Sequence, residues 1–350
     1  MVGVMDLILV NVKDSWVERA CNYAQISLVW TYNRMGTSDY CRRLRRIVVG
    51  LVAELAFYDW LSRQGIPFGL KGRTAWYEKD RWDIDVKGVP YDIKSLFVEN
   101  FPRNLSEVLD WCVLVPVDQL TTKLRKTNQF AYVFAFVSGK WFNPTQPPNF
   151  ATETLISSST IPSARWLIHV PWDFDFTKRR VGELGSLVVN AQDSRDYGRK
   201  IELGGTTVSG SGKQLNRQVV TDVVTLGPSR NATQTKFFEL LYVRWLSPMF
   251  PHGEIRIEAT NLPLSEAIPP AYGFSPSPRR HSQQGPQMNG WYDIWLYDAK
   301  VLLVGWADIN SVSGWQILRH FQPCDPVRST QTDNYFNKVM NLNPMRMLDC

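Results

Sequence analysis

The segment 83–95 alternates apolar and polar positions with the period of two that is typical of β-strands. Ile84 and Val86 alternate with aspartates in its first half, and the second half alternates in the same way. Lys87-Gly88 lies between the two halves and is suited to a two-residue loop, because glycine tolerates the positive φ that such loops need. The pattern predicts a tight β-hairpin.

With that loop, Asp83 faces Asp92 across the hairpin and Lys94 lies on the same face. Facing carboxylates repel each other, and a divalent cation is the natural compensation. Hard oxygen ligands of this kind suit magnesium. Asp85 is a competing ligand on the first arm, but the register favours Asp83 because Asp85 would face Pro90.

Two helices are predicted before the hairpin. The first covers 14–35, and the second runs from about residue 39 to Gln64 and is closed by Gly65. The second helix begins with several arginines and continues as an apolar body that contains one carboxylate, Glu54. An unpartnered carboxylate in an apolar helix is costly. Pairing with an arginine, access to water and a role in the hairpin site all remain open for Glu54.

The combination Gly50-x-x-x-Glu54, then Asp83, then Asp92-Ile93-Lys94 resembles the PD-(D/E)XK, or restriction-endonuclease-like, nucleases. The resemblance covers roughly residues 40–137. Trp82 stands where the family pattern has proline. The resemblance implies an α/β fold, with a restriction-endonuclease-like core of helices around a central mixed sheet and an additional β-rich module.

The resemblance also implies a catalytic set of Glu54, Asp83, Asp92 and Lys94. Asp83 and Asp92 would hold Mg²⁺, or Mn²⁺, with the carbonyl of Ile93 and Glu54 completing the shell. Lys94 would orient or activate the attacking water, and the metal would lower the pKa of that water. The implied activity is that of a metal-dependent DNA endonuclease of the restriction or genome-defence kind. The plainer interpretation of Lys94 is a surface salt bridge to an aspartate.

Two basic clusters are candidates for phosphate contacts. The net charge of +6 is compatible with a polyanionic partner such as DNA. The candidate residues are Arg42, Arg43 and Arg46 in the second helix, and Lys123, Arg125 and Lys126 after an apolar strand. An ordinary solvated face explains the lysine-containing cluster equally well.

The sequence leaves more than one possibility open for the partners and for the function of the protein. A homodimer is expected if both strands are cut, and an activating ligand or partner protein would also fit. The alternative function is a non-catalytic module on a nuclease-like scaffold that binds a nucleic acid, a nucleotide signal or a protein.

Composition divides the chain into five parts. They are the nuclease core with its N-terminal helices (1–142), a linker (143–164), a β-rich recognition or regulatory module (165–260), a flexible Pro/Ser/Gln-rich loop (261–290) and the C-terminal part (291–350). The C-terminal part is expected to contain a strand pair, 291–297 with 300–306, followed by a loosely packed tail from 321. Its strands either return to the nuclease core or form a separate β domain.

The cysteines and histidines show no spacing that is typical of a metal site or a catalytic site. Five scattered cysteines without a C-x-x-C motif indicate a reducing, cytoplasmic location and argue against disulfides or structural zinc. The four histidines lack metal or triad spacing, so none is assigned a role. No apolar run approaches the ~18 residues of a membrane span, and no signal peptide is predicted.

Overall fold

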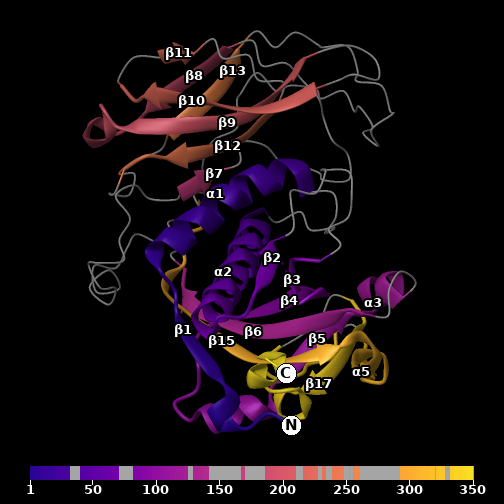
Figure 1. The fold of residues 1–350 in the computed structure, drawn as a ribbon. Coiled ribbons are helices and arrows are strands. Elements are labelled where there is room, and N and C mark those ends of the chain that lie inside the picture. The colour runs from indigo at the N-terminus through magenta and orange to yellow at the C-terminus, as the bar shows by residue number, and fades with distance from the viewer. Residues whose placement is uncertain are drawn as a thin grey trace. The chain divides into compact units, whose positions relative to one another are not determined.

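The protein has a mixed α/β fold with one large mixed sheet and several smaller sheets (Figure 1). The computed structural model describes residues 1–31, 40–70, 82–124, 129–141, 167–169, 186–209, 216–227, 231–233, 239–247, 252, 255–260, 292–319, 321–327 and 332–349. Within these residues, no helix is both long enough and apolar enough to cross a membrane.

The chain forms two compact units, and the first is discontinuous in sequence. The first unit contains residues 1–20, 46–140 and 298–350, and the second contains 21–45 and 141–297. The sequence left open whether the chain returns to the first sheet after residue 290. Strand β15 (Tyr297–Asp308) does so, because it lies in the same sheet as strands from the first 140 residues.

The first unit is built on a six-stranded sheet. Its strands, in spatial order, are β1 (Ile8–Asn11), β15, β6 (Ala131–Lys140), β4 (Val89–Val98), β3 (Ile84–Val86) and β2 (Phe68–Leu70). Strands β2, β3 and β4 pair antiparallel, whereas β4 and β6 pair parallel. A parallel pair needs a crossover connection. Here it consists of η3 (Leu105–Asp110), β5 (Cys112–Pro116) and α3 (Val117–Leu124).

Both predicted helices are present. Helix α1 spans Asp14–Thr31, and the rest of its predicted range lies outside the described residues. Helix α2 spans Tyr40–Gln64 and ends at Gly65, whose φ of 70° is the left-handed conformation expected of a glycine that closes a helix.

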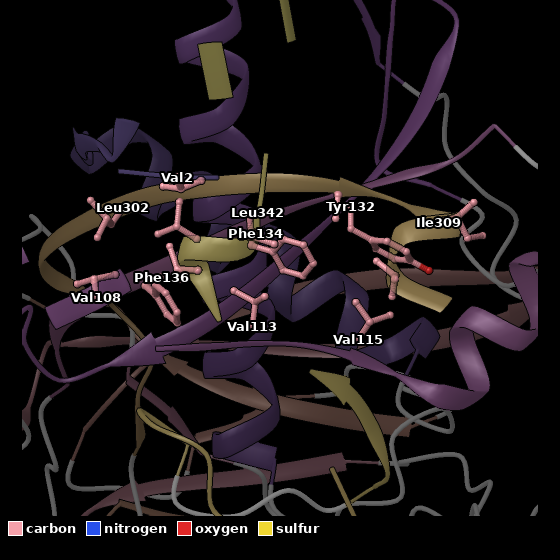
Figure 2. Close-up of a cluster of buried hydrophobic side chains, with 14 of the residues drawn as sticks. Val2, Val108, Val113, Val115, Tyr132, Phe134, Phe136, Leu302, Ile309 and Leu342 are labelled. Carbon is pink, nitrogen blue, oxygen red and sulfur yellow. The ribbon is translucent and has the colours of Figure 1, made fainter. Parts of the chain in front are cut away.

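The main core of the first unit lies between β6 and the β5 region (Figure 2). Tyr132, Phe134 and Phe136 point to this face because alternate residues of a strand share a side, and Val113 and Val115 pack against them from β5. Strand β6 is buried on both faces, which explains its nearly continuous apolar sequence.

The C-terminal segment is not the loosely packed tail that the sequence predicted. Strand β17 (Asn334–Lys338) pairs with β5 and with β16 (Gln316–Leu318) in a three-stranded sheet. Two short 3₁₀ helices follow, η8 (Val339–Asn341) and η9 (Met345–Asp349), and Val339 and Met345 are fully buried. The prediction failed because the apolar residues of this segment occur only singly or in pairs among polar ones and show no sustained strand or helix period.

The expected strand pair 291–297 with 300–306 is also wrong. Strand β14 (Tyr292–Asp293) instead pairs with β7 in the second unit, whereas β15 pairs with β1. The side chain of Asp293 is fully buried and accepts hydrogen bonds from the Trp295 backbone N–H (2.9 Å) and the Tyr297 hydroxyl (2.8 Å). These bonds stabilise an irregular segment between β14 and β15 where a hairpin turn was expected.

A disulfide joins Cys112 on β5 to Cys324, although the cysteine pattern argued against one. The two residues are 212 positions apart, with Cα atoms 6.0 Å from each other. Their pairing therefore depends on tertiary structure and leaves no local spacing signal. The cytoplasmic location stays a prediction.

The second unit contains the expected run of strands in two sheets. The five-stranded sheet has the order β10 (Asn216–Thr225), β9 (Lys200–Ser209), β12 (Glu239–Trp245), β7 (Leu167–His169) and β14. The three-stranded sheet has the order β11 (Asn231–Thr233), β8 (Ser186–Ala191) and β13 (Ile255–Thr260). Strand β9 was not predicted, because Gly204-Gly205 interrupts its pattern. The predicted linker 143–164 and loop 261–290 lie outside the described residues.

Gly305 in β15 allows the C-terminal segment to approach the sheet. Its φ is 148°, and an added Cβ would lie 2.8 Å from the Asn343 carbonyl oxygen and 2.9 Å from the Leu342 Cβ. We expect Gly305→Ala to lower the free energy of unfolding by about 2 kcal/mol, because the added methyl group overpacks a close backbone contact. Urea unfolding would measure this, with Gly50→Ala in α2 as the control, since a Cβ there meets no atom within 4 Å. An equal effect of both substitutions would contradict the prediction.

Candidate functional site

The predicted hairpin is formed by β3 and β4, and its register is confirmed. Ile84 pairs with Tyr91, Asp85 with Pro90, and Val86 with Val89. The loop residues Lys87 and Gly88 have φ values of 52° and 84°, the two positive angles of a type I′ turn.

The two faces of the hairpin differ in burial, as the alternation predicted. Ile84, Val86, Tyr91 and Ile93 are buried on one face. The aspartates and Lys94 lie half-buried on the other. Because Asp92 and Lys94 are opposite Tyr132 and Phe134 in the parallel ladder, this polar face continues onto the β6 face that carries the main core.

Asp83 lies just before β3 and approaches Asp92 through its side chain. Its backbone N–H donates to the Tyr91 carbonyl (2.8 Å), and its Oδ2 accepts a hydrogen bond from the Ile93 N–H (2.6 Å). Asp85 is occupied elsewhere, because its Oδ1 accepts from the Gly88 N–H (2.8 Å) at the turn. The structure therefore separates the two candidate ligands of the first arm. Asp83 adjoins Asp92, and Asp85 stabilises the loop.

Lys94 is held by three neighbours. Its Nζ donates to Asp92 Oδ2 (2.9 Å) and to Gln119 Oε1 (2.7 Å) in helix α3, and it lies 5.8 Å from the centroid of the Tyr132 ring. The side chains of Lys94 and Asp92 are only 20% and 14% exposed. This is not the freely solvated surface pair of the plainer interpretation, so solvent screens the interaction less than at an exposed site.

Helix α2 brings Glu54 to the same region through Tyr58. The Tyr58 hydroxyl donates to Glu54 Oε2 (3.3 Å) and lies 3.4 Å from the Asp83 carbonyl oxygen. Burial raises the pKa of Tyr58, and the charges of Glu54 and Asp83 raise it further. Tyr58 therefore remains a neutral donor near physiological pH and links the helix to the start of β3.

The carboxyl groups of the site repel one another. Burial raises the pKa of Asp83 well above its usual range, and the carboxylates of Asp92 and Glu54 raise it further, whereas the hydrogen bond from the Ile93 N–H lowers it. Asp83 and Asp92 are close enough for a direct hydrogen bond between their side chains. The charge of Asp83 is thus opposed by two other carboxylates, and Asp92 also forms an ion pair with the ammonium group of Lys94.

The geometry does not enclose a metal ion within protein ligands. In the described parts of the chain, no group of three or more His, Cys, Asp or Glu side chains has the arrangement of a metal site. Two adjacent carboxylates still match the chemistry of magnesium, which is commonly held by one or two carboxylates and keeps several water ligands.

The structure describes the side chains of only some of the predicted phosphate-binding residues. Arg42 and Arg46 are exposed, but Arg43 is 1% exposed, so its expected contact with nucleic acid is wrong for this structure. Arg43 was misassigned because the arginines follow one another in α2, and a helix turns consecutive residues to different sides. Lys123 belongs to α3 but its side chain is not described, and Arg125 and Lys126 lie outside the described residues.

Three contact residues were missed by sequence reasoning: Gln119, Tyr58 and Tyr132. Tyr58 had a usable signal, since it lies four positions after Glu54 on the same helix. Gln119 had none, because helix α3 was not predicted and its approach to Lys94 depends on the crossover connection.

No protein-family model, curated protein or solved structure was found to match this chain.

Proposed function

We propose that the first unit is a magnesium-dependent DNA endonuclease of the restriction or genome-defence type. The observation that carries the proposal is the convergence of Asp83, Asp92 and Lys94 on one face of the hairpin, where the Ile93 N–H binds Asp83 and the Lys94 ammonium binds Asp92. Two carboxylates with an adjacent ammonium group can hold a cation and contact a phosphate at the same place.

The residues present suit the proposed ion. Asp83 and Asp92 would hold Mg²⁺, or Mn²⁺, through carboxylate oxygens. The Ile93 carbonyl would be a further ligand, since the N–H and C=O of one strand residue point to the same side. The charge of Glu54 raises the pKa of Asp83, and Glu54 accepts a hydrogen bond from the Tyr58 hydroxyl. A bound magnesium ion would supply Lewis acidity, lowering the pKa of water and neutralising charge on the phosphate.

Lys94 would position the attacking water or the phosphate. Its ammonium is held between Asp92 and Gln119, so little conformational freedom is lost when it orients the attacking water or contacts a phosphate oxygen. The half-buried face strengthens these interactions relative to those in bulk water.

The order of elements supports the proposal as well. The helix that carries Glu54 is followed by three antiparallel strands, and Asp83 lies just before the second of these and Asp92 on the third. The crossover through η3, β5 and α3 then leads to the parallel strand β6. This is the helix–hairpin–strand order expected from the restriction-endonuclease-like resemblance. The β-rich second unit would recognise the target or regulate cleavage.

The test is nicking of supercoiled plasmid by the full chain in magnesium, in manganese and in EDTA. We expect cleavage only with a divalent metal, and loss of cleavage in Asp92→Asn. Lys87→Met, at the exposed loop of the same hairpin, is the matched control and should cleave like the wild type. Equal cleavage by wild type and Asp92→Asn, or none with either metal on single- and double-stranded DNA, would refute the proposal.

Gln119 is predicted to affect cleavage through Lys94. Gln119→Ala removes one of the two acceptors of the Lys94 ammonium but leaves Asp92 in place. We expect about a fivefold lower cleavage rate, the effect of losing one hydrogen bond of about 1 kcal/mol, with an unchanged metal requirement. Thr121→Ala on the exposed part of α3 is the control. If Gln119 acted only in folding, both the thermal midpoint and the rate would fall, and Gln119→Glu would not restore the rate.

A further inference from the structure

The connection between strands β8 and β9 is a hydrogen-bonded turn that joins the two sheets of the second unit. We call residues 192–199 the β8–β9 turn. Asp193 caps its short 3₁₀ helix by accepting from the Arg195 N–H (2.9 Å), and Gly198 has a φ of 81°. The Gly198 N–H donates to the Leu226 carbonyl (2.8 Å). These backbone contacts stabilise one conformation of the turn.

A buried carboxylate ties a distant loop residue to this turn. Asp196 is fully buried, and its Oδ2 accepts from the His252 N–H (2.9 Å) while its Oδ1 lies 3.0 Å from His252 Nδ1. The Nε of Arg199 lies 3.4 Å from the same Oδ1. Because a buried carboxylate needs such partners, Asp196 positions both His252 and Arg199. No role for His252 was evident from its sequence context.

The outward side of the turn is basic and aromatic. The Arg195 side chain is 65% exposed, Tyr197 is 38% exposed, and Lys200 at the start of β9 is exposed. Arg195, Arg199 and Lys200 outnumber Asp193 and Asp196, and Asp196 is withdrawn from solvent. The accessible charge is therefore positive, with an aromatic ring between the exposed cations.

We propose that the β8–β9 turn binds a strand of nucleic acid, with Arg195 and Lys200 on phosphates and Tyr197 stacked on an unpaired base. The inference rests on the proposed nuclease function and assigns the substrate contact of the second unit. Cations that follow a backbone together with an exposed ring are the features that bind single strands. Asp193 holds the Arg195 guanidinium through Nε (3.0 Å) and Nη2 (2.6 Å), which orients the five-donor group in advance.

Binding by the cleavage-deficient Asp92→Asn chain in EDTA tests the inference. The probe is a fluorescein-labelled 20-nucleotide DNA, single-stranded or duplex, followed by anisotropy across a salt series. Adding Arg195→Gln and Lys200→Gln should reduce the salt slope for the single strand by about 1.4, or 0.7 per phosphate contact. Adding Tyr197→Ala instead should weaken single-strand binding by about 5- to 150-fold without changing that slope. Duplex binding should be insensitive to Tyr197→Ala.

The matched control removes two charges from the first unit, with Lys300→Gln and Arg63→Gln. Both residues are exposed, and Asp59, the partner of Arg63, also pairs with Lys13. This chain should bind like Asp92→Asn alone, and all chains should share its thermal midpoint. Unchanged affinity and salt slope in the turn variants, or absence of DNA binding by Asp92→Asn, would overturn the inference. If the wild type cleaves plasmid but the turn variants bind DNA as Asp92→Asn alone does, only the proposed role of the β8–β9 turn is refuted. If binding depends on the turn but the wild type cleaves no DNA, the proposed nuclease function is refuted.

Discussion

Replacing Lys94 by methionine should lower the rate of metal-dependent cleavage by about 10²- to 10⁴-fold, the usual effect of removing a group that assists proton transfer or stabilises charge in the transition state. The side chain is held by Asp92 and Gln119 at 2.9 and 2.7 Å and is 20% exposed, so its position beside the carboxylates is fixed by these contacts. Initial rates of plasmid nicking in saturating magnesium would measure the effect.

Two further variants separate chemistry from folding. Lys94→Arg keeps the positive charge and the partner Asp92, but its planar guanidinium differs in shape from an ammonium, so a folded chain with a reduced rate is expected. Lys87→Met alters an exposed lysine on the same hairpin and should leave the rate unchanged. A wild-type rate in Lys94→Met would remove Lys94 from the mechanism.

Replacing Asp83 by asparagine should have opposite effects with and without metal. In EDTA, Asp83→Asn should raise the free energy of unfolding by about 0.5–2 kcal/mol, in the range of common stabilising substitutions, because it removes a half-buried carboxyl group whose charge Asp92 and Glu54 repel. In the wild type, magnesium at a hundredfold excess over its Kd should add about 2.7 kcal/mol of stability. Asp83→Asn should lose most of this gain.

The pH dependence of stability has a definite sign. The folded-state pKa of Asp83 lies above the ordinary aspartate value of 3.8, so at pH values between 3.8 and the folded-state pKa the folded chain binds more protons than the unfolded chain. The metal-free wild type should therefore lose stability as pH rises from 3.8 through the folded pKa, and Asp83→Asn should lack this loss. Below pH 3.8 Asp83 is protonated in both the folded and the unfolded chain, so it no longer makes stability depend on pH and its charge no longer destabilises the folded state.

Urea unfolding between pH 4 and pH 8, in EDTA and in magnesium, would measure both effects. Asp85→Asn is the matched control, because Asp85 lies on the same arm but bonds the turn N–H of Gly88. This variant should keep the stabilisation by metal and lose a little stability at the turn. A wild type whose stability is unaffected by magnesium or manganese would contradict metal binding at this site.

Local patterns were sufficient for the hairpin and for the second helix. Period-two alternation and Lys87-Gly88 predicted the register that places Ile84 opposite Tyr91, because a two-residue loop fixes one pairing, and in that pairing the apolar residues of both arms share one buried face. The apolar body of α2 and the closing Gly65 predicted the helix in the same way. The candidates Asp83, Asp92 and Lys94 were identified because they lie within one such local element.

Long-range contacts were not predictable from these patterns. The approach of Gln119 to Lys94, the pairing of β17 with β5 and the disulfide between Cys112 and Cys324 all join segments whose own sequences carry no mark of the partner. Arg43 shows the same limit, since its burial depends on what packs around the start of α2.

The sequence by itself determined the hairpin, its loop and the acidic face with one lysine, because strand period and turn chemistry act between neighbouring residues. Only the tertiary structure decided that Asp85 serves the loop while Asp83 adjoins Asp92, that Glu54 is joined to the site through Tyr58, and that β15 returns to the first sheet. Those outcomes depend on burial and on contacts between distant segments, which become defined only when the core between β5 and β6 is packed.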